Sequence, residues 1–153
     1  MTAFDQVSTG ISGLDKVLGH LRWGDNVVWQ VENIQDYRDI VLPFVKRALA
    51  DQNTVIYLRF GQHSPILQPD PQIKEYQLDA SLGFEAFSSR VHSIATQEGD
   101  GACYVFDSLS DLLTVWVTDL MLGNFFRVTC PYLFKLNTIA YFALLKNRNS
   151  YST

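Results

Sequence analysis

The sequence predicts a single α/β domain in which a mainly parallel five-stranded sheet lies between two layers of helices. The chain has 153 residues, which fits one domain of the usual size of about 100–200 residues. Apolar runs rich in β-branched and aromatic residues alternate with segments of helical periodicity. The runs are almost continuously apolar, as is typical of parallel strands that are covered on both faces. We therefore expect a three-layer αβα domain over residues 1–153.

Five segments have the composition of strands. In chain order they are Val27–Val31, Thr54–Phe60, Ile73–Leu78, Ala102–Phe106 and Ile139–Leu145. In parallel sheets of this kind, ligands bind beyond the carboxyl ends of the strands. Any site is therefore expected in the segments that directly follow these runs.

The segments between the strands carry apolar residues at helical spacing. One predicted helix buries Ile40, Val41, Phe44, Ala48 and Leu49, and another buries Phe84, Phe87, Val91, Ile94 and Ala95. The apolar stretch Asp111–Leu136 predicts two helices, with Ser110 as N-cap, Gly123 at the break and Pro131 restricting the second. Residues His63–Gln72, which include three prolines, predict a loop.

Composition argues against several kinds of partner. The net charge is −4, and no Lys/Arg run could neutralise a row of phosphates, so nucleic acid is not expected. No segment reaches the roughly 18 apolar residues of a membrane span, and the N-terminus lacks the features of a signal peptide, which predicts a cytoplasmic protein without a membrane partner. Cys103 and Cys130 lie in apolar surroundings without a metal-binding pattern, so both are expected to be buried, reduced thiols.

Charged residues make up 18% of the chain, which also contains 10 Phe, 7 Tyr and 3 Trp, whereas soluble proteins contain about 25% charged residues. Two interpretations remain open. Either a partner covers apolar surface, or the aromatic residues form a large core.

Three segments in order carry a resemblance to known proteins. Ser8-Thr-Gly-Ile-Ser-Gly-Leu-Asp15 is followed by the strand Gly24–Val31 and later by Ala102-Cys-Tyr-Val-Phe-Asp107. This order resembles the RecA/KaiC-like P-loop ATPases. The resemblance implies that Asp107 matches the Walker B aspartate, which helps to hold the metal ion in that family.

The chain departs from the family where the Walker A loop should follow. Residues 32–39 read Glu-Asn-Ile-Gln-Asp-Tyr-Arg-Asp, without the glycines and the lysine that form a phosphate cradle. Arg38 and Asp39 occupy the last two positions of the motif. Glu32, Asp36 and Asp39 would place carboxylates near a triphosphate, which is electrostatically unfavourable. ATP and Mg²⁺ are therefore not expected as cofactors.

Further candidate site residues follow two of the strands. The family resemblance implies acidic residues after the second strand, where this chain has Gln62 and His63. Gln62 cannot act as a general base, whereas a neutral histidine can. After the fourth strand, Asp107 and Ser108 are candidates, and Asp107 is the metal ligand if there is one. Ser110 and Asp111 are interpreted as helix-start residues, and His20 and His92 as structural or exposed.

The whole chain also resembles the N-terminal domain of phosphoenolpyruvate/pyruvate-binding, phosphoenolpyruvate synthase-like proteins. The segments that carry this resemblance are Gly24–Val31, Tyr104–Asp107, Met121–Phe126 and Thr129–Tyr132. It implies that phosphotransfer chemistry belongs to other domains of such a protein. It also implies that the RecA-type core continues beyond the last predicted strand, with residues 146–153 as a linker to a missing domain.

Three hypotheses follow for the function. The first is a non-catalytic RecA/KaiC-like module for protein interaction, oligomerisation or regulation, whose partner is another protein, another domain of the same polypeptide or a second copy. The second is a sensor that binds a small phosphate or carboxylate through Arg38 or Arg59 at the ends of the first, second and fourth strands. The third is a divergent ATPase in which Arg38 replaces the lysine and His63 or Asp107 assists catalysis.

Overall fold

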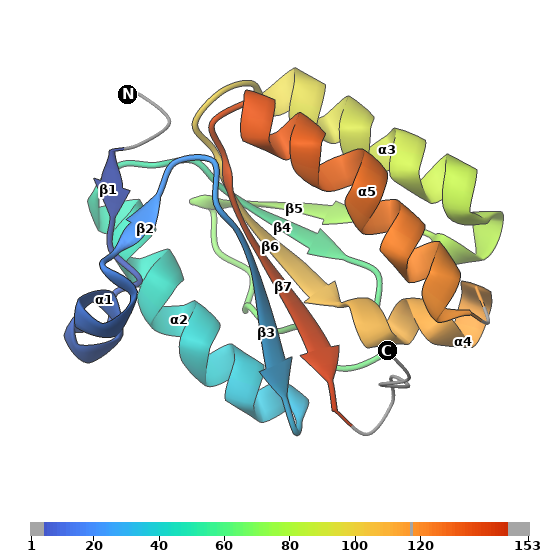
Figure 1. Cartoon of the computed structure of the whole chain (residues 1–153), viewed down its shortest axis with the longest axis horizontal. Helices are drawn as coiled ribbons and strands as arrows, with labels where there is room; N and C mark the ends of the chain where they lie inside the picture. The colour runs from blue at the N-terminus through green and yellow to red at the C-terminus, as the bar shows by residue number, and fades with distance from the viewer. Residues whose placement is uncertain (1–4, 117, 147–153) are drawn as a thin grey trace.

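The computed structural model describes residues 5–116 and 118–146, and a five-stranded parallel sheet runs through their centre (Figure 1). The strands are β3 (Asn26–Val31), β4 (Val55–Arg59), β5 (Ile73–Gln77), β6 (Cys103–Ser108) and β7 (Ile139–Leu145), in the spatial order β3-β7-β6-β4-β5. All neighbouring strands are parallel. All five predicted strands are confirmed, and their ends shift by no more than two residues.

Helices cover both faces of the sheet, which confirms the three-layer arrangement (Figure 1). Helix α2 (Ile34–Ala50) packs on one face, and α3 (Phe84–Glu98) packs beside α5 (Asp119–Lys135) on the other. Each face has its own apolar cluster. The predicted buried face of α2 is correct for Val41, Phe44 and Ala48, whereas Ile40 is only partly buried.

The segment between β6 and β7 differs from the prediction. A 3₁₀ turn, η2 (Leu109–Leu112), leads into the short helix α4 (Leu113–Trp116), and α5 then runs unbroken through Gly123 and Pro131. The prediction of a break at Gly123 was wrong, because a glycine inside a helix costs only about 1 kcal/mol and the neighbouring Phe125 is fully buried. The N-cap of α5 is Thr118, whose Oγ1 accepts a hydrogen bond of 3.3 Å from the Met121 N–H.

Ser110 does not cap a helix, contrary to the prediction. It lies inside η2 and is fully buried. Its Oγ accepts a hydrogen bond of 2.9 Å from the backbone N–H of Leu145. This serine therefore ties η2 to the carboxyl end of β7.

A small unit that the sequence did not predict precedes the sheet. Strand β1 (Gln6–Val7) pairs antiparallel with β2 (Leu21–Arg22), and helix α1 (Ser12–Leu18) lies between them in the chain. Gly10 has a φ of +82°, and a Cβ at this position would lie 2.1 Å from the carbonyl oxygen of Pro43 in α2. Only glycine allows this close approach, so the lead-in segment packs directly on α2.

Asp15 gives the Ser8–Asp15 lead-in pattern a structural explanation. Its nearly buried carboxylate accepts hydrogen bonds of 2.7 Å from both the N–H and the hydroxyl of Thr9, and another from the Ser8 hydroxyl. Burial alone would raise the pKa of Asp15, but the hydrogen bonds from Ser8 and Thr9 lower it. The Ser-Thr…Asp pattern thus closes the turn that leads into α1.

The remaining expectations concern isolated side chains. Cys103 is buried and Cys130 is partly exposed; both are free, and burial raises their pKa values to about 12 and about 11. His92 is structural, because its ring stacks on Tyr132 between α3 and α5. In the described part of the chain, no helix combines the length and the apolar character needed to cross a membrane. Of the predicted linker, only Lys146 lies within the described residues.

Candidate functional site

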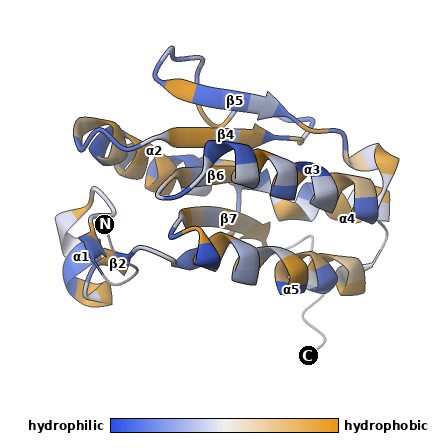
Figure 2. Ribbon diagram, turned by 90° about the horizontal axis from the view of Figure 1, so that it is seen from above, coloured by the Kyte–Doolittle hydropathy of each residue, from blue (hydrophilic) through white to orange (hydrophobic). Residues whose placement is uncertain are grey.

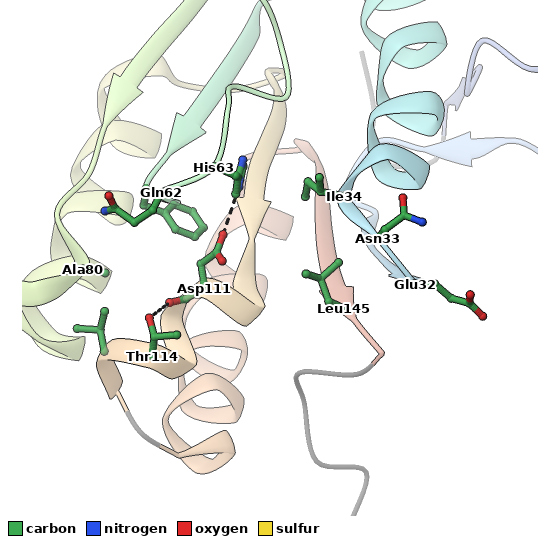
Figure 3. A pocket seen from close by; sticks show the side chains of 11 residues that line it. Glu32, Asn33, Ile34, Gln62, His63, Ala80, Asp111, Thr114 and Leu145 are labelled. Atoms are coloured by element: carbon green, nitrogen blue, oxygen red, sulfur yellow. Dashed lines mark hydrogen bonds and ion pairs between the residues drawn. The ribbon is translucent and has the colours of Figure 1, made fainter.

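A pocket of about 540 Å³ opens at the carboxyl edge of the sheet. It lies beyond the ends of β3, β4, β6 and β7, where parallel α/β sheets bind their ligands. Its lining residues are Glu32, Asn33, Ile34, Phe60, Gln62, His63, Ala80, Asp111, Thr114, Val115 and Leu145 (Figure 3). A pocket therefore lies at the edge of the sheet where the sequence analysis expects a site.

The pocket has two unlike walls. Figure 3 shows His63 and Asp111 facing each other on one side, with Thr114 below them, and Ile34 and Leu145 on the opposite side. The side chain of Glu32 extends away from both walls into solvent. No lysine or arginine is among the described residues that line this pocket.

His63 is engaged at both ring nitrogens. Its Nε2 lies 3.2 Å from Oδ2 of Asp111, and its Nδ1 lies 2.7 Å from the carbonyl oxygen of Ser64, which can only accept a hydrogen bond (Figure 3). The close contact with the Asp111 carboxylate raises the pKa of His63, and partial burial opposes this effect. The arrangement favours the imidazolium form, which donates from both nitrogens.

Asp107 lies beneath the pocket and is fully buried. Its carboxylate accepts hydrogen bonds from the Tyr57 hydroxyl and from the backbone N–H groups of Phe60 and Gly61, the latter two at 2.9 Å each. Nε2 of His63 lies 3.9 Å from Oδ1 of Asp107. Burial, followed by the charge of Asp107, raises the pKa of Tyr57. The carboxylate therefore joins the end of β6 to the turn after β4.

Gly61 was missed by the sequence analysis, although it directly precedes two candidate residues. A Cβ at this position would lie 2.5 Å from Oδ2 of Asp111 and 2.5 Å from Nε2 of His63. The missing side chain therefore provides the space in which these two side chains meet. A glycine at the end of a strand, next to polar residues, is the signal that could have drawn attention to it.

Arg38 is held away from the pocket. Its guanidinium donates to the carbonyl oxygens of Ile66 at 3.2 Å and Pro65 at 3.0 Å, and to the Gln35 side chain at 2.7 Å. The Tyr57 hydroxyl also accepts a hydrogen bond of 3.0 Å from the N–H of Ile66. Together these contacts fix the loop after β4 over the α2 face of the sheet, where Ile66 is 1% exposed.

Asn33 is a second residue that the sequence analysis missed. It is the N-cap of α2, and its Oδ1 accepts a hydrogen bond of 3.1 Å from the N–H of Asp36. The N-termini of helices that follow a parallel strand commonly bind anions through their free N–H groups. The side chain of Asn33 thus satisfies a backbone donor that an anion would otherwise contact.

The structure brings together only some of the predicted candidates. Three of them line the pocket: Glu32, Gln62 and His63. Those outside it are the exposed Asp36 and Asp39 on α2, Arg38, the partly buried Arg59, and the buried Asp107 and Ser108. Asp111, interpreted as a helix-start residue, does lie in the first turn of η2, and its side chain also faces His63 in the pocket.

The described residues contain no group of three or more His, Cys, Asp or Glu side chains arranged to hold a metal ion. Neither the protein-family models nor the curated proteins that we compared with this chain match it. Its function must therefore be inferred from the geometry of the site itself.

Proposed function

We propose that this chain is a non-catalytic RecA/KaiC-like module that acts through contacts with proteins. The observation that carries the proposal is the burial and hydrogen bonding of Asp107, the residue that matches the Walker B aspartate. This carboxylate is 0% exposed, and both of its oxygens accept hydrogen bonds from Tyr57, Phe60 and Gly61. A metal-binding aspartate has to direct an oxygen toward the ion. In this chain Asp107 instead has a structural role.

The start of α2 supports the same conclusion. Asn33 caps the helix, and the carboxylates of Glu32 and Asp36 are exposed beside it. Arg38, at the position of the Walker lysine, is directed toward the loop after β4. The helix end thus offers negative charge where a nucleotide would need positive charge and open N–H groups.

The two alternatives receive less support. A general base needs one nitrogen that can reach the substrate, whereas both nitrogens of His63 face acceptors within the protein, which disfavours the divergent ATPase. The pocket could hold a small molecule, but neither Arg38 nor Arg59 lines it. The anion sensor therefore loses the two residues on which that hypothesis depended.

Thermal unfolding with and without ligands tests the proposal. We expect no change in the unfolding temperature with Mg²⁺-ATP, ADP, phosphate, pyruvate or phosphoenolpyruvate. A ligand at 100 times its Kd would stabilise the fold by about 2.7 kcal/mol, so a ligand added at about 10 mM would produce this stabilisation if its Kd were about 0.1 mM. Stabilisation by Mg²⁺-ATP would contradict the proposal, and stabilisation by a small anion alone would favour the sensor.

An Asp107→Asn variant separates a structural carboxylate from a metal ligand. An amide cannot accept all the hydrogen bonds that Asp107 accepts, so we expect a loss of roughly 2–4 kcal/mol in the free energy of unfolding. Asp39→Asn is the matched control, because Asp39 is exposed on α2, and a change within about 0.5 kcal/mol is expected. A metal ligand would behave in the opposite way. Its removal would leave the metal-free protein stable and abolish any stabilisation by Mg²⁺.

A further inference from the structure

The contact between His63 and Asp111 joins two segments of one pocket wall that are distant in the chain. His63 lies in the loop after β4, and Asp111 lies in η2 after β6. Nε2 of His63 is 3.2 Å from Oδ2 of Asp111, and both residues line the pocket (Figure 3). The position of the loop at this wall therefore depends on the state of the histidine.

His63 faces oxygen acceptors at both of its ring nitrogens. The carbonyl oxygen of Ser64 lies 2.7 Å from Nδ1, and carboxylate oxygens of Asp111 and Asp107 lie 3.2 Å and 3.9 Å from Nε2. A neutral imidazole carries a proton on only one nitrogen. In either neutral tautomer, one nitrogen lone pair would therefore point at an oxygen lone pair. With the carboxylates ionised, the observed contacts fit the imidazolium form and neither neutral tautomer.

The charged groups that face His63 are carboxylates. They are Asp107 at the end of β6 and Asp111 in η2, and the Tyr57 hydroxyl of β4 donates a hydrogen bond to Asp107. Burial raises the pKa of Tyr57, so this hydroxyl stays neutral. The side chain of Glu32 extends into solvent, and no lysine or arginine lines the described pocket. Since these surroundings raise the pKa of His63 above about 6.5, the ring loses its proton near neutral pH.

The loop after β4 is fixed on both sides of the histidine. Before it, the N–H of Gly61 donates a hydrogen bond of 2.9 Å to Asp107. After it, the carbonyl oxygen of Pro65 accepts a hydrogen bond of 3.0 Å from Arg38. Strand β4 itself is hydrophobic (Figure 2), and four of its five residues are buried. Residues 62–64 are therefore the segment that can move while the sheet stays in place.

We propose that residues 62–64 form a pH-sensitive latch on the pocket, which is closed by protonated His63 and released when His63 is neutral. In the closed form the imidazolium balances the carboxylate of Asp111. After release, this wall of the pocket carries one more negative charge, and the ring leaves the space beside Gly61. Both the shape and the charge of the pocket thus change with pH, as in other switches based on histidine protonation.

The inference rests on the proposed function in one respect, because it treats Asp107 as a structural carboxylate. A metal ion held by Asp107 would lie beside His63 and lower its pKa. The latch does not depend on the proposed contacts with proteins. It adds regulation by pH to the same pocket.

An NMR titration of the full chain from about pH 5.5 to 8.5 tests the latch. The ring protons report the pKa of His63, and a nuclear Overhauser effect between the ring and Gly61 reports the closed form. A Cβ at Gly61 would lie 2.7 Å from Cδ2 of His63, so one Hα of this glycine lies next to the ring. We expect a strong ring–Gly61 signal below the pKa of His63 and its loss above that pKa. A signal that persists unchanged above the pKa would overturn the proposal.

Asp111→Asn separates the latch from a merely structural contact. An amide can accept a hydrogen bond from the imidazolium through Oδ1 and donate one to the neutral ring through Nδ2. The ring–Gly61 signal should therefore become independent of pH in this variant, and the pKa of His63 should fall. Glu32→Gln is the matched control, because Glu32 lines the same pocket but extends into solvent. It should titrate like the wild type, and a pH-independent signal in Glu32→Gln as well would contradict the assignment to Asp111.

The titration is repeated with Mg²⁺ and with a chelator, so that the two proposals can fail separately. A pKa of His63 that falls only with Mg²⁺ would contradict the structural role of Asp107 and, with it, the proposed function. An unchanged pKa together with a ring–Gly61 signal that persists at high pH would overturn the latch alone. If Asp111→Asn does not fold, the wild-type titration still decides whether the contact is lost with the proton.

Discussion

Gly61→Ala is the substitution that most directly perturbs the pocket. The added Cβ would lie 2.5 Å from both Oδ2 of Asp111 and Nε2 of His63, well inside van der Waals contact. Both atoms are the ends of side chains, so the two residues should separate while the backbone stays in place. The variant loses the His63–Asp111 interaction and gains some crowding.

The expected cost follows from these two effects. The side chains of His63 and Asp111 are 21% and 16% exposed, so solvent screens part of their attraction. Crowding in a packed site typically costs about 1–3 kcal/mol, and movable side chains place this case at the low end. We therefore expect a loss of about 1–2 kcal/mol, and a melting temperature lower by roughly 2–4 °C per kcal/mol.

Gly123→Ala is the matched control. Gly123 lies inside α5, and a Cβ there would meet nothing within 4 Å. Alanine should therefore stabilise the helix by about 0.5–1 kcal/mol. The same chemical change thus has opposite signs at the two glycines.

Urea unfolding and an NMR titration of the histidines measure the outcome. Besides the loss of stability, we expect the pKa of His63 to fall toward the ordinary value in Gly61→Ala, because Asp111 is the main cause of its elevation. A variant that is as stable as the wild type, with an unchanged His63 titration, would refute this account of the glycine.

Three further predictions concern other parts of the fold. Asn33→Ala removes the N-cap of α2 and should cost about 1 kcal/mol, measured by urea unfolding. Arg38→Met removes the hydrogen bonds to residues 65 and 66 and should speed proteolysis in the loop after β4; an unchanged cleavage rate would argue against this role. Because the folded-state pKa of His63 is raised, its stabilising contribution is complete below about pH 6.5 and is lost as the pH rises through that raised pKa. The pKa of His92 is lowered by burial, so His92 has the opposite effect: it lowers the free energy of unfolding as the pH falls. Unfolding free energies from pH 5 to 9 should therefore fall less steeply with rising pH in Asp111→Asn than in the wild type.

The sequence alone determined the sheet and the helices on its two faces. Runs such as Ile139–Leu145 are apolar at every position, and a strand buried on both faces requires this composition wherever it lies in the sheet. The spacing of Val41, Phe44 and Ala48 likewise predicts one buried helix face. These signals are local, and each can be recognised without knowing which segment packs against it.

Only the tertiary structure decided the roles of the polar residues. Asp107 is joined to Tyr57 and Gly61 across about 50 positions of the chain, and the orientation of Arg38 depends on a loop 27 and 28 residues away. No local pattern shows whether a carboxylate at the end of a strand faces a pocket or the backbone of a neighbouring turn. The start of α5 was also decided by tertiary contacts. The burial of Phe125 outweighs the helix-breaking tendency of Gly123, so the helix continues through this glycine. Residue spacing fixed the elements, whereas contacts between distant segments fixed what the candidate site can bind.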